Sequence, residues 1–268
     1  MKIAALQMVS TPDVPTNLAA ARRLVQQAAG AGAQLVALPE YFCLMGQSDR
    51  DKLAIAEAPG DGPIQQMLSD AAREQGLWII GGTLPLRSND PERVLNASCV
   101  FGPDGAQVAR YDKIHLFKYD NGRESYDEGR AIQAGHQAQS FQAGDIRVGL
   151  SVCYDLRFPE LYRALMHPPC DLLAVPSAFT HTTGKAHWEL LLRARAVENQ
   201  CYVVAAAQGG LHTNGRRTYG HSMVVDPWGG VVSVLAEGEG VVMAELDTSR
   251  IASVRAQLPA LEHRKIGA

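Results

Sequence analysis

Apolar residues are arranged in two alternating patterns along the chain. Short, nearly continuous apolar runs are typical of buried strands. Between them, apolar residues recur every three or four positions, as on a helix that buries one face. Asn17 is placed to cap the first helix, and Pro63 to open the second. We expect strands at 3–8, 35–40, 77–85, 146–152, 171–176, 202–207 and 241–246, and helices at 18–29, 63–75, 158–166, 186–198 and 248–257.

Two further segments predict hairpins, and one predicts a long loop. Strand-like runs flank a Pro-Asp-Gly turn within residues 96–113, and two more flank the turn at 226–230. Residues 118–135 are polar, contain glycine and lack periodicity, which indicates a functional loop. The strands are separated by helices in some places and by hairpins in others. We therefore expect a mixed sheet, or a pair of sheets, with helices on the outside. We expect one α/β domain over residues 1–268.

Composition and charge narrow the function classes. The chain is 46% apolar and 20% charged, with a net charge of −3 and no long block of like charge. This balance argues against nucleic acid and an anionic membrane as the main partner. No apolar stretch approaches the roughly 18 residues of a spanning helix, and the N-terminus resembles a first strand more than a signal peptide. Five widely spaced cysteines without a CxxC pattern fit reduced thiols in a cytoplasmic protein.

Three chemically complementary residues follow apolar strands. Glu40, Lys113 and Cys153 each come where a predicted strand ends, so they are candidates for a common rim at the carboxyl ends of the strands. Taken singly, Glu40 and Lys113 could be solvated loop residues and Cys153 an inert core thiol. Together they supply a nucleophile, a base that takes its proton and an ammonium that stabilises an oxyanion. This set suits attack on an amide or nitrile carbon.

Other reactive residue types lack a comparable pattern. The eight histidines form no HxH or HExxH sequence, so we expect no metal site. No GxGxxG or GxxxxGK[ST] sequence occurs, so we expect no nucleotide cofactor. A Cys–His dyad that uses His181 or His187 is conceivable from residue types alone. Cys43, three residues after Glu40, could be a second thiol near the site, although core packing also accounts for it.

Three sequence segments resemble a known family. ALPEYF with Glu40, YDKIHLF with Lys113 and LSVCYDLRFPELYR with Cys153 are similar, in this order, to the signature segments of the nitrilase superfamily of carbon–nitrogen hydrolases. The resemblance extends nearly end to end. It implies a four-layer αββα sandwich in which Cys153 attacks the carbonyl and Glu40 is general base and acid. Lys113 and the backbone N–H of Tyr154 would then form the oxyanion hole.

The resemblance also implies a second glutamate beside the lysine, on the loop before the cysteine strand. Glu128 fits this role best, because it keeps the family's interval to Gly135. Glu124 is the alternative, since the loop is longer here than in many relatives.

Two C-terminal segments are similar to the Nit subgroup of amidases. These are residues 184–208 and 218–229, and AAAQGG followed shortly by YGHS resembles the deaminated-glutathione amidases more than the omega-amidases. The former hydrolyse the amide between the distal carboxyl of 2-oxoglutarate and Cys-Gly, and the latter release ammonia from 2-oxoglutaramate. By resemblance, Phe179 and Thr183 line the acyl pocket. Arg157 would clamp the 2-oxo-acid carboxylate, unless it forms an ion pair with Asp155 or Glu160.

The sequence therefore predicts a thiol amidase without cofactor, acting on a small-molecule amide that carries a 2-oxo-acid carboxylate. An omega-amidase or related short-chain amidase is the alternative enzyme. A catalytically silent binding or scaffold protein is the alternative from another class. By resemblance, we also expect a homodimer or a larger homo-oligomer.

Overall fold

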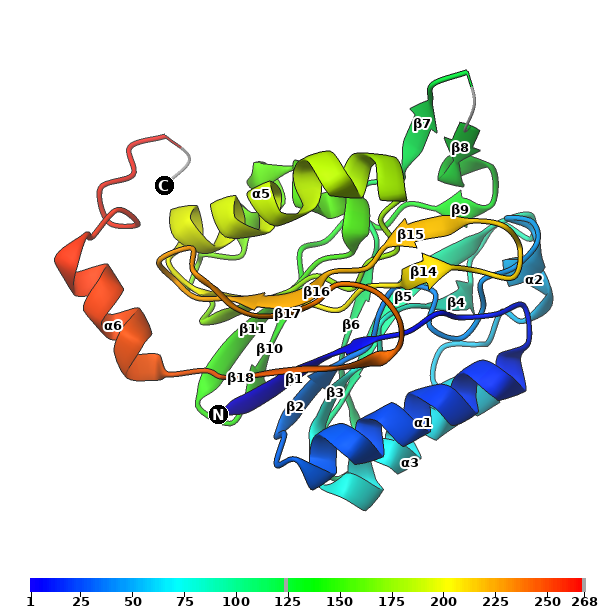
Figure 1. The fold of residues 1–268 in the computed structure, drawn as a ribbon, viewed down its shortest axis with the longest axis horizontal. Helices are drawn as coiled ribbons and strands as arrows, with labels where there is room; N and C mark the ends of the chain where they lie inside the picture. Colours follow the sequence, from blue (N-terminus) through cyan, green and yellow to red (C-terminus); the bar gives the residue numbers. More distant parts are fainter. Residues whose placement is uncertain (123–124, 267–268) are drawn as a thin grey trace.

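Four layers make up the molecule. A computed structural model describes residues 1–122 and 125–266. The helices α1 (Val14–Gly30) and α3 (Pro63–Gln75) cover the outer face of one sheet, and α5 (His181–Asn199) covers the outer face of a second (Figure 1). The inner faces of the two sheets pack on each other through a shared apolar core. The predicted order of layers, helix, sheet, sheet and helix, is confirmed.

The first sheet combines parallel and antiparallel pairs, as expected for a mixed sheet. Its N-terminal strand lies between one parallel and one antiparallel neighbour. In spatial order its strands are β18 (Gly240–Glu245), β1 (Lys2–Gln7), β2 (Leu35–Ala37), β3 (Trp78–Ile80), β5 (Val94–Phe101) and β4 (Leu84–Arg87), and β6 (Gln107–Asp112) and β9 (Ile132–Gln133) also pair with β5.

The second sheet is built from the C-terminal half of the chain, with parallel strands at its centre. In spatial order its strands are β10 (Ser140–Ala143), β11 (Ile146–Leu150), β12 (Leu172–Ala174), β13 (Tyr202–Ala205), β16 (Ser222–Val225) and β17 (Val231–Leu235). The remaining elements are the strand pairs β7 (Lys118–Asp120) with β8 (Ser125–Asp127) and β14 (Gly209–Leu211) with β15 (Arg217–Tyr219), the helices α2 (Asp51–Ala54), α4 (Pro159–Ala164) and α6 (Thr248–Gln257), and the 3-10 turns η1 (Glu128–Arg130) and η2 (Cys153–Arg157).

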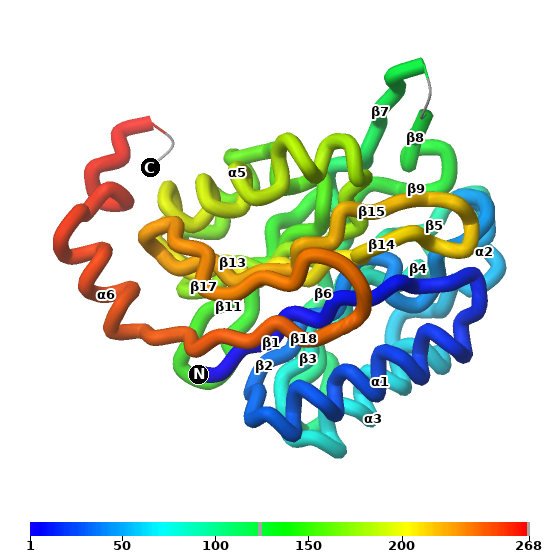
Figure 2. Tube along the Cα trace, viewed as in Figure 1, coloured from blue at the N-terminus to red at the C-terminus, as the bar shows by residue number. Residues whose placement is uncertain are grey.

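The two-residue period of β1 explains how one strand serves two cores. Ile3 and Ala5 face the second sheet, whereas Ala4 and Leu6 face the core under α1 and α3. All four residues are fully buried, which is why the strand is an uninterrupted apolar run in the sequence. Figure 2 shows how the chain returns at the end to β18, which lies beside β1 although the two are far apart in sequence.

Local hydrogen bonding changes the predicted start of the first helix. Asp13 caps α1, because its carboxylate accepts the Thr16 N–H at 2.9 Å. The prediction of Asn17 as the cap is wrong. Asn17 is buried, and its side-chain amide donates to the carbonyls of Thr11 at 2.8 Å and Cys43 at 2.9 Å. It therefore ties the helix to the loop that follows Glu40.

Two other predicted segments differ in the structure. The strand expected over 77–85 is divided into β3 and β4 at Gly82, which has a φ of +52°. The segment 118–135 is not a loop without regular structure, since β7, β8, η1 and β9 lie within its described part. β7 and β8 pair and extend away from the layers (Figure 1). Within residues 1–122 and 125–266, no helix has both the length and the apolar character needed to cross a bilayer.

Candidate active site

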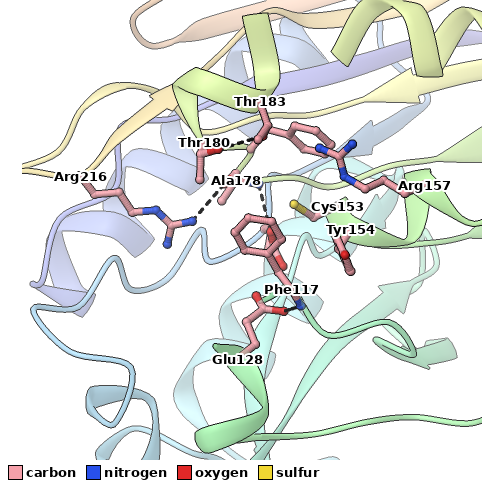
Figure 3. Close-up of a pocket in the computed structure, with 11 residues that line it drawn as sticks. Phe117, Glu128, Cys153, Tyr154, Arg157, Ala178, Thr180, Thr183 and Arg216 are labelled. Atoms are coloured by element: carbon pink, nitrogen blue, oxygen red, sulfur yellow. Dashed lines mark hydrogen bonds between the residues drawn. The ribbon is translucent and has the colours of Figure 1, made fainter. Parts of the chain in front are cut away.

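The ends of three strands deliver the three predicted groups to one place. Glu40 follows β2, Lys113 follows β6, and Cys153 follows β11. A pocket of about 290 Å³ opens beside Cys153 (Figure 3). Lys113 is fully buried and is not among the lining residues. The residues expected at the site that line this pocket are Glu40, Glu128, Cys153, Tyr154, Arg157, Phe179 and Thr183.

Lys113 is held between two carboxylates. Its ammonium donates to Oε1 of Glu40 at 2.8 Å and to the two oxygens of Glu128 at 3.0 and 2.8 Å. Burial favours the neutral amine, but Glu128 and then Glu40 outweigh this effect and raise the pKa of Lys113 above its ordinary value. Burial likewise opposes the charge on Glu128, yet the attraction of Lys113 holds the pKa of that carboxyl below its usual range. The site thus holds a permanently charged lysine.

Glu40 is fixed by donors from three segments. Besides Lys113, the side-chain amide of Asn96 donates to its Oε1 at 2.9 Å, and the backbone N–H of Ala178 donates to its Oε2 at 3.0 Å. Only 1% of Glu40 is exposed. A buried carboxylate with its lone pairs occupied is restricted to one orientation. Glu40 is therefore a rigid group that faces the pocket.

Cys153 stands on a strained turn. Its φ of +48° is unusual for a residue other than glycine. The turn is held because the Cys153 N–H donates to the Pro176 carbonyl at 2.9 Å and the buried Asp155 carboxylate accepts the Val152 N–H at 2.8 Å. Tyr154 is the second residue of η2, where backbone N–H groups have no acceptor within the helix. The turn therefore presents a thiol and an N–H group together.

The surroundings of Cys153 favour the protonated thiol. Burial is the largest influence and raises the pKa of the thiol well above its ordinary value, and the negative charge of Glu40 adds to it. Lys113 acts in the opposite direction but does not outweigh them. A thiol in this state needs a base beside it in order to attack.

Arg157 lies at the pocket wall without a carboxylate partner. No Asp or Glu among the described residues forms an ion pair with it, so the alternative of a pair with Asp155 or Glu160 is wrong. Asp155 instead accepts from the Tyr111 hydroxyl at 2.7 Å. The Arg157 guanidinium lies 5.3 Å from the Phe179 ring centroid, and its Nη1 is 3.2 Å from Nδ1 of His187. The fork is therefore available to an anion in the pocket.

Phe179 and Thr183 are held in place by their neighbours. The ring of Phe179 packs on Trp188 of α5, with centroids 4.9 Å apart. The Thr183 hydroxyl lies 2.8 Å from the Thr180 hydroxyl, and the two threonines both line the pocket. An apolar wall with a few fixed hydroxyls is a common form of small-molecule site.

Sequence reasoning missed three residues of the site. The Tyr41 hydroxyl donates to Glu128 at 2.6 Å, and the Phe117 N–H donates to the same carboxylate at 2.7 Å. The quoted segments ALPEYF and YDKIHLF contain both, so adjacency to Glu40 and Lys113 could have indicated them. Arg216 lines the pocket from the β14–β15 turn, and no pattern in the sequence distinguishes it from other loop arginines.

Other candidates lie outside the pocket. His181 packs against the Tyr219 ring, and neither His181 nor His187 is among the described residues that line the cavity, which does not support a Cys–His dyad. Cys43 is buried in the core under α1 and α3, and burial raises its pKa to about 12. Glu124, the alternative second glutamate, lies outside the described residues. Among those described, no cluster of His, Cys, Asp and Glu could hold a metal ion.

Comparison with known proteins gives consistent similarities over the whole chain. A family model described as carbon-nitrogen hydrolase matches residues 2–256. The chain is 40% identical over 265 residues to the deaminated glutathione amidase of Synechocystis sp., covering 97% of each protein. It is 38% identical over 265 residues to the omega-amidase NIT2 of Danio rerio, covering 98% of this chain and 94% of the relative.

Solved structures match nearly the whole chain as well, at lower identity. Nit3 of Saccharomyces cerevisiae, a member of branch 10 of the nitrilase superfamily, matches with a TM-score of 0.89 at 31% identity, over 99% of this chain and 97% of Nit3. An amidase of Nesterenkonia sp., solved after Michael addition of acrylamide at its active-site cysteine, matches with a TM-score of 0.81 at 28% identity, over 97% and 98%.

Proposed function

We propose, from the premise that this chain belongs to the carbon–nitrogen hydrolase family of the nitrilase superfamily and hydrolyses amides, that Cys153, Glu40 and Lys113 carry out the reaction. The observation that carries the proposal is that the buried Lys113 ammonium is hydrogen-bonded to Glu40 and Glu128. Both of these carboxylates line the same pocket as Cys153. These groups supply a nucleophile, a base and a cation at one place.

In the first half of the reaction, Glu40 takes the thiol proton as the Cys153 sulfur bonds to the amide carbon. The base is required because burial keeps the thiol protonated. The carbonyl oxygen becomes an oxyanion that Lys113 and the Tyr154 N–H stabilise, and each such donor contributes about 2.7–4 kcal/mol in known cases. Glu40 then returns the proton to the departing nitrogen. The C–N bond breaks and leaves a thioester on Cys153.

In the second half, Glu40 takes a proton from water, and the resulting hydroxide attacks the thioester carbon. The same oxyanion donors serve again. The C–S bond breaks, the proton returns to the sulfur, and a carboxylic acid leaves. Glu128 does not exchange a proton in this cycle. Its role is to hold Lys113, because it accepts two of the ammonium hydrogen bonds and is itself held by Tyr41 and Phe117.

The substrate we propose is deaminated glutathione, cleaved to 2-oxoglutarate and Cys-Gly. Arg157 would bind the 2-oxo-acid carboxylate, since its planar fork matches a carboxylate and has no acidic partner among the described residues. Phe179 and Thr183 would line the acyl chain. The 40% identical relative with this activity in its name supports the assignment. The omega-amidase at 38% identity supports 2-oxoglutaramate as the second candidate substrate.

Replacement of the nucleophile tests the core of this proposal. Cys153→Ala should lower turnover of 2-oxoglutaryl amides by at least about 10³-fold, as loss of a nucleophile does in comparable enzymes. Mass spectrometry of wild-type protein quenched with substrate should show a 2-oxoglutaryl adduct on Cys153. Unchanged turnover, or no labelling of Cys153 by a thiol-directed electrophile, would instead favour a scaffold protein. The ratio of kcat/KM for deaminated glutathione and 2-oxoglutaramate then decides between the two substrates.

We also propose a homodimer or a larger homo-oligomer in the cytoplasm. Leu190 and Val197 on α5 are 67% and 50% exposed, and Val232 on β17 is 51% exposed. A second copy of the chain would remove these apolar side chains from water. The five unpaired thiols suit a reducing compartment. Sedimentation of wild-type protein and of a Leu190→Glu variant tests the assembly, which the charge should weaken.

A further inference from the structure

A second arginine faces the pocket from the side opposite Arg157. Arg216 ends the turn between β14 and β15, and in Figure 3 Cys153 lies between the two guanidinium groups. Its Nη2 donates to the Ala178 carbonyl at 3.2 Å, and its guanidinium carbon lies 5.2 Å from the Tyr126 ring centroid. Arg216 is thus held in a defined position at the pocket wall.

Arg216 has donors that the described residues do not satisfy. No Asp or Glu of residues 1–122 and 125–266 forms an ion pair with it, and its Nε is buried without a hydrogen-bond partner. A buried polar group without a partner is costly, and a guanidinium loses more than a neutral group does. The five fixed donors of an arginine are suited to a planar carboxylate. The geometry therefore indicates an anion that residues 1–122 and 125–266 do not provide.

The backbone of Ala178 connects Arg216 to Glu40. The N–H of Ala178 donates to Glu40 at 3.0 Å, whereas its carbonyl accepts from Arg216 at 3.2 Å. Glu40 and Arg216 are therefore held by two atoms of one residue. In the proposed reaction Glu40 gives its proton to the departing nitrogen, so that half of the substrate lies toward Glu40. Arg157 then faces the acyl half, and Arg216 the amine half.

A larger hollow adjoins the pocket at Arg216. It is an open depression of about 1090 Å³, solvent space included, lined by residues 46–49, Tyr126, Asn214 and Arg217 among others, with Arg216 common to both spaces. Ammonia would need no such space. An amine half that is a peptide would extend past Arg216 into the hollow, and its terminal carboxylate would come within reach of the guanidinium.

We propose that Arg216 is a second anion-binding residue, specific for a carboxylate on the departing half of a dianionic amide. This inference rests on the proposed function, because it uses Glu40 as the proton donor to define the two sides. The two arginines then hold the two ends of the substrate and leave the amide carbon at Cys153. The substrate class is an acyl-dipeptide with a carboxylate at each end, in preference to a primary amide.

The test compares two amides that differ at one end. One is 2-oxoglutaryl-Cys-Gly, and the other is the same molecule with the glycine carboxylate converted to an amide. Wild-type kcat/KM should favour the free carboxylate by about 10- to 100-fold, the range expected for a charge-assisted hydrogen bond. Arg216→Gln should abolish most of this preference. Arg216→Lys, which keeps the charge but not the fork, should retain part of it.

Arg50→Gln is the control, since it removes the same charge from a residue that lines neither the pocket nor the hollow and whose guanidinium pairs with Glu92 at 3.1 Å. It should leave the preference intact. If Arg50→Gln lowers the preference as much as Arg216→Gln does, the effect comes from the general field and not from a site. If Arg216→Gln lowers kcat/KM equally for both amides, Arg216 only braces the turn. Either result overturns the proposal.

Titration calorimetry of the Cys153→Ala variant measures the affinity for each amide independently of turnover. This variant should bind both amides without cleaving them. Tighter binding of the carboxylate form, lost in Cys153→Ala with Arg216→Gln, supports the site. Equal binding of the two forms refutes it. If Cys153→Ala binds with this preference but the wild-type protein cleaves neither amide, the proposed function is refuted and the anion site stands. If the wild-type protein cleaves both amides but neither its kcat/KM nor the binding shows the preference, the anion site is refuted and the proposed function stands.

Discussion

At the scale of single residues, the site buries three charged side chains that stabilise one another. Glu40, Glu128 and Lys113 place a net negative charge in the buried interior, where an unpaired ion costs several kcal/mol. Each carboxylate is satisfied by hydrogen bonds, because Glu40 has Asn96 and the Ala178 N–H in addition to the lysine. The arrangement fixes an ammonium where an oxyanion would form. Removal of the lysine should therefore cost stability as well as activity.

Lys113→Met should lower the free energy of unfolding at pH 7 by about 3–5 kcal/mol, the usual cost of leaving a buried charge without its partner. Lys113 lowers the pKa of Glu128, so in the variant that pKa rises and protonation becomes easier. The deficit should therefore shrink as the pH falls toward 5, where the carboxyl takes up a proton. Urea unfolding of both proteins at pH 7 and pH 5 measures this.

A second substitution provides the control for Lys113→Met. Adding Glu128→Gln removes the uncompensated charge, so the double variant should be more stable at pH 7 than Lys113→Met alone. A deficit that does not change with pH, together with no recovery in the double variant, would show that lost packing and not charge explains the cost.

At the scale of elements, the strand ends set the position of each proposed catalytic group, and the turns after them hold the backbone there. Glycine is needed at one such turn. Gly82 has a φ of +52°, and a Cβ atom at this position would lie 2.1 Å from the Pro39 carbonyl oxygen. Pro39 precedes Glu40, so the turn between β3 and β4 packs directly on the backbone that positions the proposed base.

Gly82→Ala should destabilise the fold by about 2–5 kcal/mol, since it adds a left-handed alanine and a backbone clash. It should also lower kcat of the folded fraction, because displacement of Pro39 moves Glu40. Gly76→Ala is the control. Gly76 has a similar φ of +61° but no atom within 4 Å of the added Cβ, so it should cost only about 1 kcal/mol and leave kcat unchanged. Equal effects of the two substitutions on stability and on kcat would contradict this explanation.

The sequence predicts most of the elements because apolar periodicity records burial on the two faces of a strand or helix. The predicted bounds of α3 and α6 agree with the structure. The strand ends at Glu40, Lys113 and Cys153 were predictable for the same reason, and so was their convergence. Arg216 was not, because a turn residue acquires its place through tertiary contacts with Ala178 and Tyr126. Asn17 was misplaced because Asp13, four residues earlier, competes for the same capping role.

At the scale of the whole molecule, the layered packing buries more titratable groups than the reaction uses. All five cysteines are buried and free. Cys43, Cys99, Cys170 and Cys201 lie in the cores and not in the pocket. Burial is the first cause of a raised pKa for each of them, to about 12 for Cys43 and Cys99 and about 11 for Cys170. The folded state therefore keeps thiol protons that the unfolded chain releases near pH 9.

Stability should consequently fall as the pH rises from 8 to 10. Above pH 9 the unfolded state binds fewer protons than the folded state, so the free energy of unfolding decreases with pH, by up to about 1.4 kcal/mol per pH unit for each thiol concerned. Lys113 contributes with the same sign at still higher pH, because its pKa is raised in the folded protein. Urea unfolding under reducing conditions measures the slope. Replacing Cys43 and Cys99 by Ala should lower the free energy of unfolding at every pH, because it leaves cavities. It should nevertheless make the decrease of that free energy with pH shallower. A slope that is the same in this variant and in the wild type would show that the buried thiols do not set the alkaline limit.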